Sequence, residues 1–122
     1  MAKKVLIVDD DPDLVELLRL AFQHSGYTAL TAGSGRDALE KAAKHHPDLI
    51  VLDLVLPDVN GINVCEALRR SPSTASTPIL MMTGQPGEFP RLASVEAGSN
   101  AFLSKPFAIP QLIEQAARLV AP

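Results

Sequence analysis

The chain has 122 residues, of which 11 are basic and 14 acidic, giving a net charge of -3. This length suits one domain over residues 1–122. The single cysteine excludes an internal disulfide, and no apolar stretch approaches the roughly 20 residues of a membrane span. We therefore expect a cytoplasmic protein, and the lack of a basic block argues against direct nucleic-acid binding.

Apolar runs and helical patterns alternate five times along the sequence. Short apolar runs between polar breaks predict buried strands, and apolar residues three or four positions apart predict helices. The predicted strands cover residues 4–9, 28–32, 48–53, 79–83 and 101–104. The predicted helices cover residues 12–25, 62–70, 90–98 and 109–120, and one more lies between an N-cap at Ser34 and a stop at Pro47.

Each predicted helix has an apolar face that we expect to point inward. The first helix offers Leu14, Leu17, Leu18, Ala21 and Phe22, and the second offers Ala38, Leu39, Ala42 and Ala43. The third offers Val64, Cys65 and Leu68, and the fifth offers Leu112, Ile113, Ala116, Leu119 and Val120. The fourth helix follows a segment with two glycines and two prolines, so we expect it to be short and the least firmly held.

This alternation predicts an α/β fold with a five-stranded parallel sheet and helices on both faces. A doubly wound, flavodoxin-like (βα)5 sheet with strand order 2-1-3-4-5 is the favoured arrangement. Periodicity alone does not choose this order over other doubly wound orders. In this order the first and third strands are neighbours at the topological switch point, where ligands bind in such sheets.

Charged side chains follow three of the predicted strands. Asp9 ends the first strand and Asp10 follows it, Asp53 ends the third, and Lys105 follows the fifth. The carboxyl ends of parallel strands open onto one edge, so we expect the four groups to meet. Three carboxylates repel one another unless a cation lies among them. The pattern therefore indicates a bound metal beside a lysine, and chemistry on an anionic group.

With these residues in place, the whole chain resembles the receiver domain of two-component response regulators, in the style of the chemotaxis and sporulation regulators. No single mark is specific, but the marks occur in order at the family's spacing. They are Asp9-Asp10, Asp53, Pro57, Gly61, Thr83 and Lys105-Pro106. The resemblance implies the strand order given above, and structural roles for Pro57 and Gly61.

The resemblance also implies a metal-dependent phosphorylation site. It makes Asp53 the phosphoryl acceptor, Asp10 a direct ligand of Mg²⁺ (or Mn²⁺), and Asp9 a ligand partly through water. The backbone carbonyl of Val55 becomes a further ligand. Independently of the family, a set of carboxylates and a carbonyl suits magnesium better than zinc.

A switch is implied by the same resemblance. Thr83 and Lys105 would contact the phosphoryl oxygens, Phe102 would be the aromatic switch residue, and the bond between Lys105 and Pro106 would be cis. A phosphoryl group on Asp53 would draw Thr83 inward and let Phe102 fill the vacated space. The surface remodelled would be the fourth helix, fifth strand and fifth helix.

The leading hypothesis is a signalling module that catalyses only its own phosphorylation and dephosphorylation. The implied donor is a sensor histidine kinase or histidine phosphotransferase, and the implied target is a downstream protein or a fused output domain. Whether the chain is free-standing or part of a longer protein stays open. Val55 and Gln85 flank the site and are predicted to tune the dephosphorylation rate. Asp58 and Asn60 are predicted turn formers, although Asp58 lies close enough to tune the field of the site.

Three other classes compete with this hypothesis. One is a Mg²⁺-dependent aspartyl-phosphate phosphatase, which is disfavoured because Val55 stands where a second aspartate would be needed and the chain leaves no room for a cap domain. Another is a degenerate receiver that acts as a constitutive protein-binding module, which the intact site residues argue against. The last is a nucleotide or flavin binder, which would need a phosphate-binding loop after the first strand. The acidic segment 10–13 occupies that place and would repel phosphate.

Overall fold

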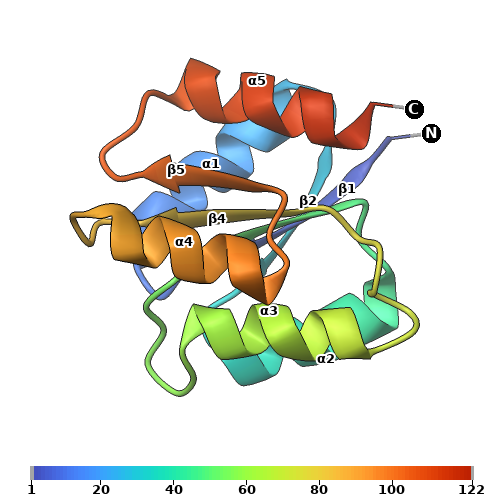
Figure 1. The fold of residues 1–122 in the computed structure, drawn as a ribbon. Helices are drawn as coiled ribbons and strands as arrows, with labels where there is room; N and C mark the ends of the chain where they lie inside the picture. Colours follow the sequence, from blue (N-terminus) through green and yellow to red (C-terminus); the bar gives the residue numbers. More distant parts are fainter. Residues whose placement is uncertain (1, 122) are drawn as a thin grey trace.

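A computed structural model describes residues 2–121, in which strands and helices alternate along the chain (Figure 1). The strands are β1 (Lys4–Val8), β2 (Thr28–Ala32), β3 (Leu49–Asp53), β4 (Ile79–Thr83) and β5 (Ala101–Ser104). The helices are α1 (Pro12–His24), α2 (Gly35–His45), α3 (Gly61–Arg70), α4 (Glu88–Ala97) and α5 (Ile109–Val120). Among the described residues, no helix combines the length and apolarity needed to cross a bilayer.

The sheet is parallel throughout and has the order β2-β1-β3-β4-β5, which confirms the predicted flavodoxin-like fold. Helices α1 and α5 cover one face, and α2, α3 and α4 cover the other (Figure 1). Alternate residues of β1 enter the two cores, so Val5 and Ile7 face α1 and α5 while Leu6 and Val8 face the opposite helices. Every residue of β3 and β4 is buried, as expected for central strands of a parallel sheet.

The strand register aligns the carboxyl ends of the strands at one edge of the sheet. Val8 pairs with Leu52 of β3, and Asp53 pairs with Met82 of β4. At the next pair, Thr83 lies opposite Ser104 of β5. Residues that directly follow β1, β3 and β5 therefore emerge at the same edge.

Helix α4 begins at Glu88, two residues before the predicted start at residue 90. Gly87 is its N-cap, so Pro90 occupies the third position of the first turn. The first backbone N–H groups of a helix have no partner within the helix, and a proline without an N–H is therefore tolerated there. The two glycines and two prolines of the preceding segment had suggested a later start, at residue 90, which is two positions too late.

Two residues expected to face inward are exposed. In α1 the fully buried side chains are Leu18 and Phe22, whereas Leu17 is 52% exposed. Consecutive helix residues point about 100° apart, so Leu17 lies on the flank of the buried stripe. In α2 Ala38 and Ala42 are buried, and Ala43 is exposed for the same reason. The predicted apolar faces were therefore one residue too wide.

Arg69 of α3 ties together three segments at the end of the sheet away from the carboxyl ends of the strands. Its Nε donates to the carbonyl oxygen of Gly98 at 3.0 Å, and its Nη2 donates to Oδ1 of Asn100 at 2.9 Å. Its Nη1 donates to carbonyls of the loop 71–78. The carboxyl end of α4 is therefore held to α3 by a clasp centred on Arg69, whereas no side chain caps its amino end at Gly87.

Gly61 allows the β3–α3 loop to close tightly against the end of β3. Its N–H donates to the carbonyl of Leu54 at 2.7 Å. A Cβ atom at this position would lie 2.3 Å from the carbonyl oxygen of Asp53 and 2.8 Å from Cα of Leu54. Both contacts are with backbone, which cannot move aside without shifting the strand end.

We therefore expect Gly61→Ala to lower the free energy of unfolding by about 1 to 3 kcal/mol, measured by urea denaturation. Gly33→Ala is the matched control, since a Cβ there meets nothing within 4 Å, and it should change stability by less than about 0.5 kcal/mol. Equal stabilities for the two variants would contradict the close approach at Gly61.

Candidate functional site

The three predicted carboxylates meet at the edge where β1 and β3 end. Asp9 and Asp10 directly follow β1, and Asp53 is the last residue of β3. One carboxylate oxygen from each of the three lies within 4.8 Å of the others. Asp9 and Asp53 are buried, 2% and 6% exposed, whereas Asp10 is exposed. The cluster therefore has a buried floor and one acid that opens to solvent.

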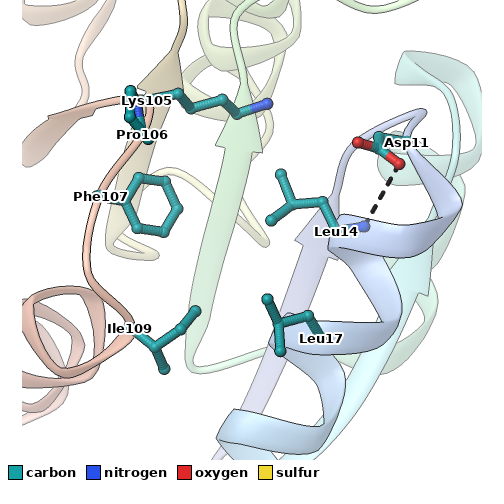
Figure 2. Close-up of a pocket in the computed structure, with 7 residues that line it drawn as sticks. All are labelled: Asp11, Leu14, Leu17, Lys105, Pro106, Phe107 and Ile109. Atoms are coloured by element: carbon teal, nitrogen blue, oxygen red, sulfur yellow. Dashed lines mark hydrogen bonds between the residues drawn. The ribbon is translucent and has the colours of Figure 1, made fainter.

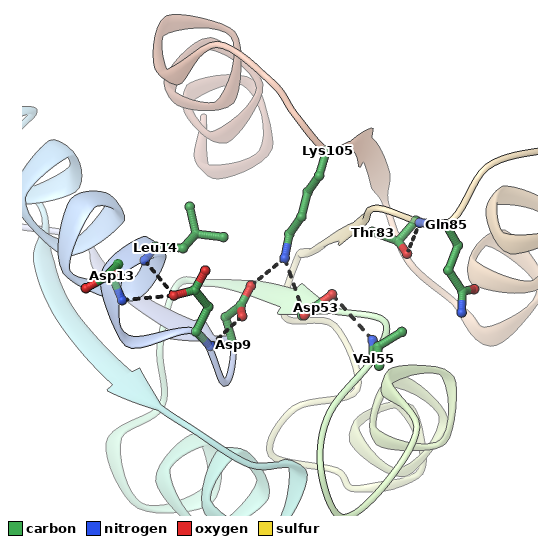
Figure 3. Close-up of polar contacts among 9 residues, drawn as sticks. Asp9, Asp13, Leu14, Asp53, Val55, Thr83, Gln85 and Lys105 are labelled. Carbon is green, nitrogen blue, oxygen red and sulfur yellow. Dashed lines mark hydrogen bonds and ion pairs between the residues drawn. The ribbon is translucent and has the colours of Figure 1, made fainter.

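Lys105 reaches this cluster from the far edge of the sheet. Its Nζ donates to Oδ2 of Asp9 at 2.7 Å and to Oδ2 of Asp53 at 3.4 Å (Figure 3). Its backbone N–H donates to the carbonyl of Thr83 at 2.7 Å, which holds it to the end of β4. The peptide bond between Lys105 and Pro106 is cis. The ammonium therefore lies between two buried acids.

The two consecutive acids after β1 differ in their surroundings. Asp9 has partners for both oxygens, because Oδ1 accepts the N–H of Asp11 at 2.9 Å and Oδ2 accepts Lys105. Within residues 2–121, no hydrogen bond to the carboxylate of Asp10 is found. Asp11 instead caps α1 by accepting the N–H groups of Asp13 and Leu14. The exposed Asp10 is thus the acid that a cation from solution meets first.

The electrostatics of the cluster show an excess of negative charge. Burial raises the pKa of Asp53, and the neighbouring Asp9 raises this pKa further, while Lys105 opposes both effects. For Lys105, burial alone would lower the pKa, but the hydrogen bond to Asp9 and the attraction of both acids outweigh burial and raise this pKa. One ammonium therefore does not balance three carboxyl groups, and an added cation would lower the repulsion.

The donor set fits a magnesium ion. All candidate ligand atoms in the cluster are carboxylate oxygens, which hard divalent cations prefer, and the open side at Asp10 leaves room for the waters that magnesium retains. Val55 lies two residues after Asp53, and its N–H donates to Oδ1 of Asp53 at 3.4 Å (Figure 3). Its side chain is 51% exposed. The Val55 backbone therefore borders the cluster.

The other predicted site residues lie around the cluster rather than in it. Thr83, at the end of β4, is fully buried, and its Oγ1 accepts the N–H of Gln85 at 3.0 Å (Figure 3). Gln85 is exposed in the loop before α4. Phe102 lies inside β5, opposite Met81, and packs partly buried against the core beneath α2, α3 and α4. Pro57 is exposed in the loop after β3.

Asp58 has a contact that the sequence argument missed. We predicted it as a turn former, but its carboxylate accepts the N–H groups of Gly35 at 2.8 Å and Arg36 at 3.0 Å. It therefore binds the amino end of α2, more than twenty residues earlier in the chain. These hydrogen bonds lower the pKa of Asp58, that from Arg36 most. No local pattern in the sequence could have indicated a pair so far apart.

An apolar groove runs from the lysine side of the cluster along α1. It has a volume of about 380 Å³ and lies between α1 and the β5–α5 segment. Leu14 and Leu17 line one wall, and Phe107 and Ile109 line the other, with Lys105 at one end (Figure 2). The exposure of Leu17 is therefore explained by its place in this groove.

Residues 5–117 match the family model of the response regulator receiver domain. The chain is 44% identical over 107 residues to the alkaline phosphatase synthesis transcriptional regulatory protein PhoP of Bacillus subtilis, covering 88% of this chain and 44% of that protein. It is 36% identical over 110 residues to response regulator ArlR of Staphylococcus aureus, covering 90% of this chain and 49% of that protein. The chain therefore spans about half the length of these curated relatives.

Solved structures agree in fold over the full chain. A crystal structure from Chloroflexus aurantiacus, described as that of a response regulator, has a TM-score of 0.95 and 36% identity, covering 100% of both chains. Chemotaxis response regulator CheY4 of Vibrio cholerae has a TM-score of 0.92 and 32% identity, covering 98% of this chain and 99% of that one.

The raised pKa of Asp53 predicts that Asp53→Asn stabilises the metal-free protein at pH 7. When the folded pKa of an acid lies above its unfolded value, ionisation favours unfolding, so the group costs stability at every pH above its folded pKa. We expect the variant to melt a few degrees higher at pH 7 in the presence of a chelator. The difference should shrink as the pH falls below the folded pKa and vanish well below 3.8, the ordinary pKa of the side chain.

Asp13→Asn, at an exposed acid in the first turn of α1, is the control for removing one negative charge. A metal-free Asp53→Asn variant that melts below wild type at pH 7 would show that the ion pair with Lys105 outweighs burial and repulsion.

Proposed function

We propose that Asp53 is a phosphoryl acceptor that works with bound Mg²⁺. The chain belongs to the response regulator receiver domain family, whose members are phosphoacceptors of two-component signalling. The observation that carries this proposal is the convergence of Asp9, Asp10 and Asp53 with the Lys105 ammonium at one edge of the sheet. A receiver is not a classical enzyme, since it modifies itself, and this sets aside the phosphatase alternative considered above.

In the proposed reaction, a carboxylate oxygen of Asp53 attacks the phosphorus of a phosphohistidine. An O–P bond forms, the P–N bond breaks, and the electron pair leaves with the imidazole nitrogen. Phosphoryl transfer depends chiefly on positioning and charge neutralisation. Lys105, which already contacts Asp53, is placed to bind an oxygen of the transferred group. The product is an acyl phosphate. Because water hydrolyses acyl phosphates, the modification would be a transient signal.

The proposed metal ligands are Asp10, Asp53, the backbone carbonyl of Val55, and Asp9 partly through water. Mg²⁺, or Mn²⁺ in its place, supplies positive charge to the phosphoryl oxygens. Asp9 is placed to act mainly by holding Lys105, because both of its oxygens have protein partners. Asp10 is placed to act mainly as a ligand, because it is exposed beside the other two acids.

We also propose that Thr83 and Phe102 transmit the modification to α4, β5 and α5. Thr83 Oγ1 accepts the N–H of Gln85, which leaves the hydroxyl proton of Thr83 to be donated to a phosphoryl oxygen on Asp53. Thr83 follows Met81 by two residues, so its side chain lies on the same face of the sheet as Phe102. The proposed target is a downstream protein or an output domain of the same polypeptide.

The proposed phosphodonor is a sensor histidine kinase or a histidine phosphotransferase in the cytoplasm. Its histidine must come within bonding distance of Asp53, so the donor must contact the rim of the cluster. The apolar groove beside Lys105 supports a contact there, because Leu14, Leu17, Phe107 and Ile109 offer an unfilled apolar surface next to the reacting group.

The direct test of the proposed acceptor is the intact mass after incubation with acetyl phosphate. We expect wild type to gain one phosphoryl group that requires Mg²⁺ and is removed by hydroxylamine. Asp53→Asn should gain none, and the control Asp13→Asn should behave as wild type. No gain in a folded wild type that binds Mg²⁺ would favour the alternative of a constitutive protein-binding module.

The groove predicts that Leu17→Ser slows phosphorylation by a protein donor but not by acetyl phosphate. Leu20→Ser is the matched control, because Leu20 has nearly the same exposure on the same helix, 51% against 52%, but does not line the groove. Purified histidine kinases would first be phosphorylated with labelled ATP, and the kinase that phosphorylates wild type fastest would be chosen. Its rate of phosphoryl transfer to wild type and to each variant would then be compared. We expect a loss of about tenfold for Leu17→Ser, in line with about 1.4 kcal/mol of docking energy. Equal rates for the two variants would exclude the groove as the docking surface.

Val55 and Gln85 stay predicted rate-tuning residues. Val55 contacts Asp53 through its N–H, Gln85 contacts Thr83 through its N–H, and both residues are exposed, so water that attacks the acyl phosphate would approach near them. Their substitution should change the rate of phosphate loss in the mass assay more than it changes Mg²⁺ affinity. Equal effects on both quantities would contradict this role.

A further inference from the structure

The loop between β3 and α3, residues 54–60, carries part of the proposed metal site on its crest. The loop is closed at its base, where Leu54 N–H donates to Met82 and Gly61 N–H donates to Leu54. Asn60 caps α3 by accepting the N–H of Ile62 at 2.7 Å. The crest lies between these two anchors and begins at the exposed Val55. The N–H of Val55 is held by Oδ1 of Asp53 at 3.4 Å, so the direction of the Val55 carbonyl depends on the residues of the crest that follow it.

Asp58 links this crest to a different element. Its Oδ1 accepts the N–H of Gly35 at 2.8 Å and of Val59 at 2.9 Å, and its Oδ2 accepts the N–H of Arg36 at 3.0 Å. Gly35 and Arg36 are the first two residues of α2. A carboxylate at a helix amino end is favoured both by hydrogen bonding and by the helix dipole. The crest is thus tied to a helix that packs on the sheet.

Close packing reinforces the same contact. A Cβ atom on Gly35 would lie 2.8 Å from Cγ2 of Val64, 3.2 Å from Cβ of Val59 and 3.4 Å from Oδ1 of Asp58. The amino end of α2 therefore lies directly against the loop and the first turns of α3. A loose crest would have to separate from this packed surface as well as break the hydrogen bonds.

Helix α2 has a cap of its own and does not depend on Asp58 alone. Ser34 Oγ accepts the N–H of Asp37 at 3.1 Å, and Ser34 occupies the N-cap position. Loss of Asp58 would leave this cap in place. The main consequence of losing Asp58 should therefore fall on the loop, while loss of the Ser34 hydroxyl should fall on the helix.

From these contacts, we propose that Asp58 is a positioning residue for the metal site: by binding the amino end of α2 it holds the loop crest that presents the Val55 carbonyl. This inference rests on the proposed Mg²⁺ site. It differs from an effect of charge, in which the Asp58 carboxylate would attract the cation through space. Geometry and charge make different predictions for asparagine, which removes the whole charge but only part of the link to α2. Its Oδ1 can still accept the N–H of Gly35, whereas its Nδ2 cannot accept the N–H of Arg36.

The test compares Asp58→Ala, Asp58→Asn and Ser34→Ala with wild type. Mg²⁺ affinity would be measured by calorimetry without any phosphodonor. We expect Asp58→Ala to bind Mg²⁺ about tenfold more weakly, as for other residues that orient a metal ligand, and Ser34→Ala to stay within about twofold of wild type. Asp58→Asn should fall between them, at about threefold, because it keeps one of the two hydrogen bonds to α2. Affinity as weak in Asp58→Asn as in Asp58→Ala would overturn the proposal in favour of charge, and unchanged affinity in Asp58→Ala would overturn it outright.

Amide hydrogen exchange of the metal-free proteins supplies a readout that does not depend on Mg²⁺. In Asp58→Ala the amide of Gly61, at the base of the loop, should exchange faster, while the amide of Ala38, which donates to Ser34 inside α2, should not. Ser34→Ala should show the reverse. Loss of protection at both amides in Asp58→Ala would mean that Asp58 only stabilises α2, which would overturn its positioning role. A wild type that binds no Mg²⁺ but shows the expected exchange pattern would refute the metal site and leave the loop anchor intact.

Discussion

The ion pair between Lys105 and Asp9 spans the carboxyl edge of the sheet. Lys105 follows β5 at the outer edge, and Asp9 follows β1, with β4 and β3 between them. The pair can form only if the intervening strands end at the same level, as their register ensures. Because the lysine lies over the end of β3 on its way to Asp9, it also contacts Asp53. The position of the proposed acceptor therefore depends on the packing of the whole sheet and not on one loop.

The two faces of the sheet serve different parts of the proposed function. The groove lined by Leu14, Leu17, Phe107 and Ile109 belongs to the side covered by α1 and α5. Phe102 packs on the opposite side, beneath α4. The strand ends are the shared boundary of these two sides, and the acidic cluster lies there. A modification of Asp53 thus takes place between the proposed donor surface and the proposed output surface, within reach of both.

The sequence predicts those features of the structure that depend on residues close together in the chain or on a general rule of sheet geometry. The strands and the meeting of Asp9, Asp10, Asp53 and Lys105 follow from periodicity and from the rule that parallel strands end at one edge. The cap at Ser34 follows from the local sequence. The strand order needed the family resemblance, since several orders satisfy the same pattern. Tertiary contacts decided the rest. The exposure of Leu17 depends on where α5 lies, and the partners of Asp58 are 22 and 23 residues away.

The two ends of α4 are held differently. Its carboxyl end is bound through Gly98, while its amino end begins at an uncapped Gly87, only a few residues after Thr83. A helix bound by hydrogen bonds at one end rotates about that end more readily than it shifts as a whole. Displacement then grows with distance from the anchor, so a small shift at Thr83 moves the first turn of α4 furthest. Phe89 lies in that turn and is 80% exposed, so such a rotation would move a large apolar side chain on the surface of the protein.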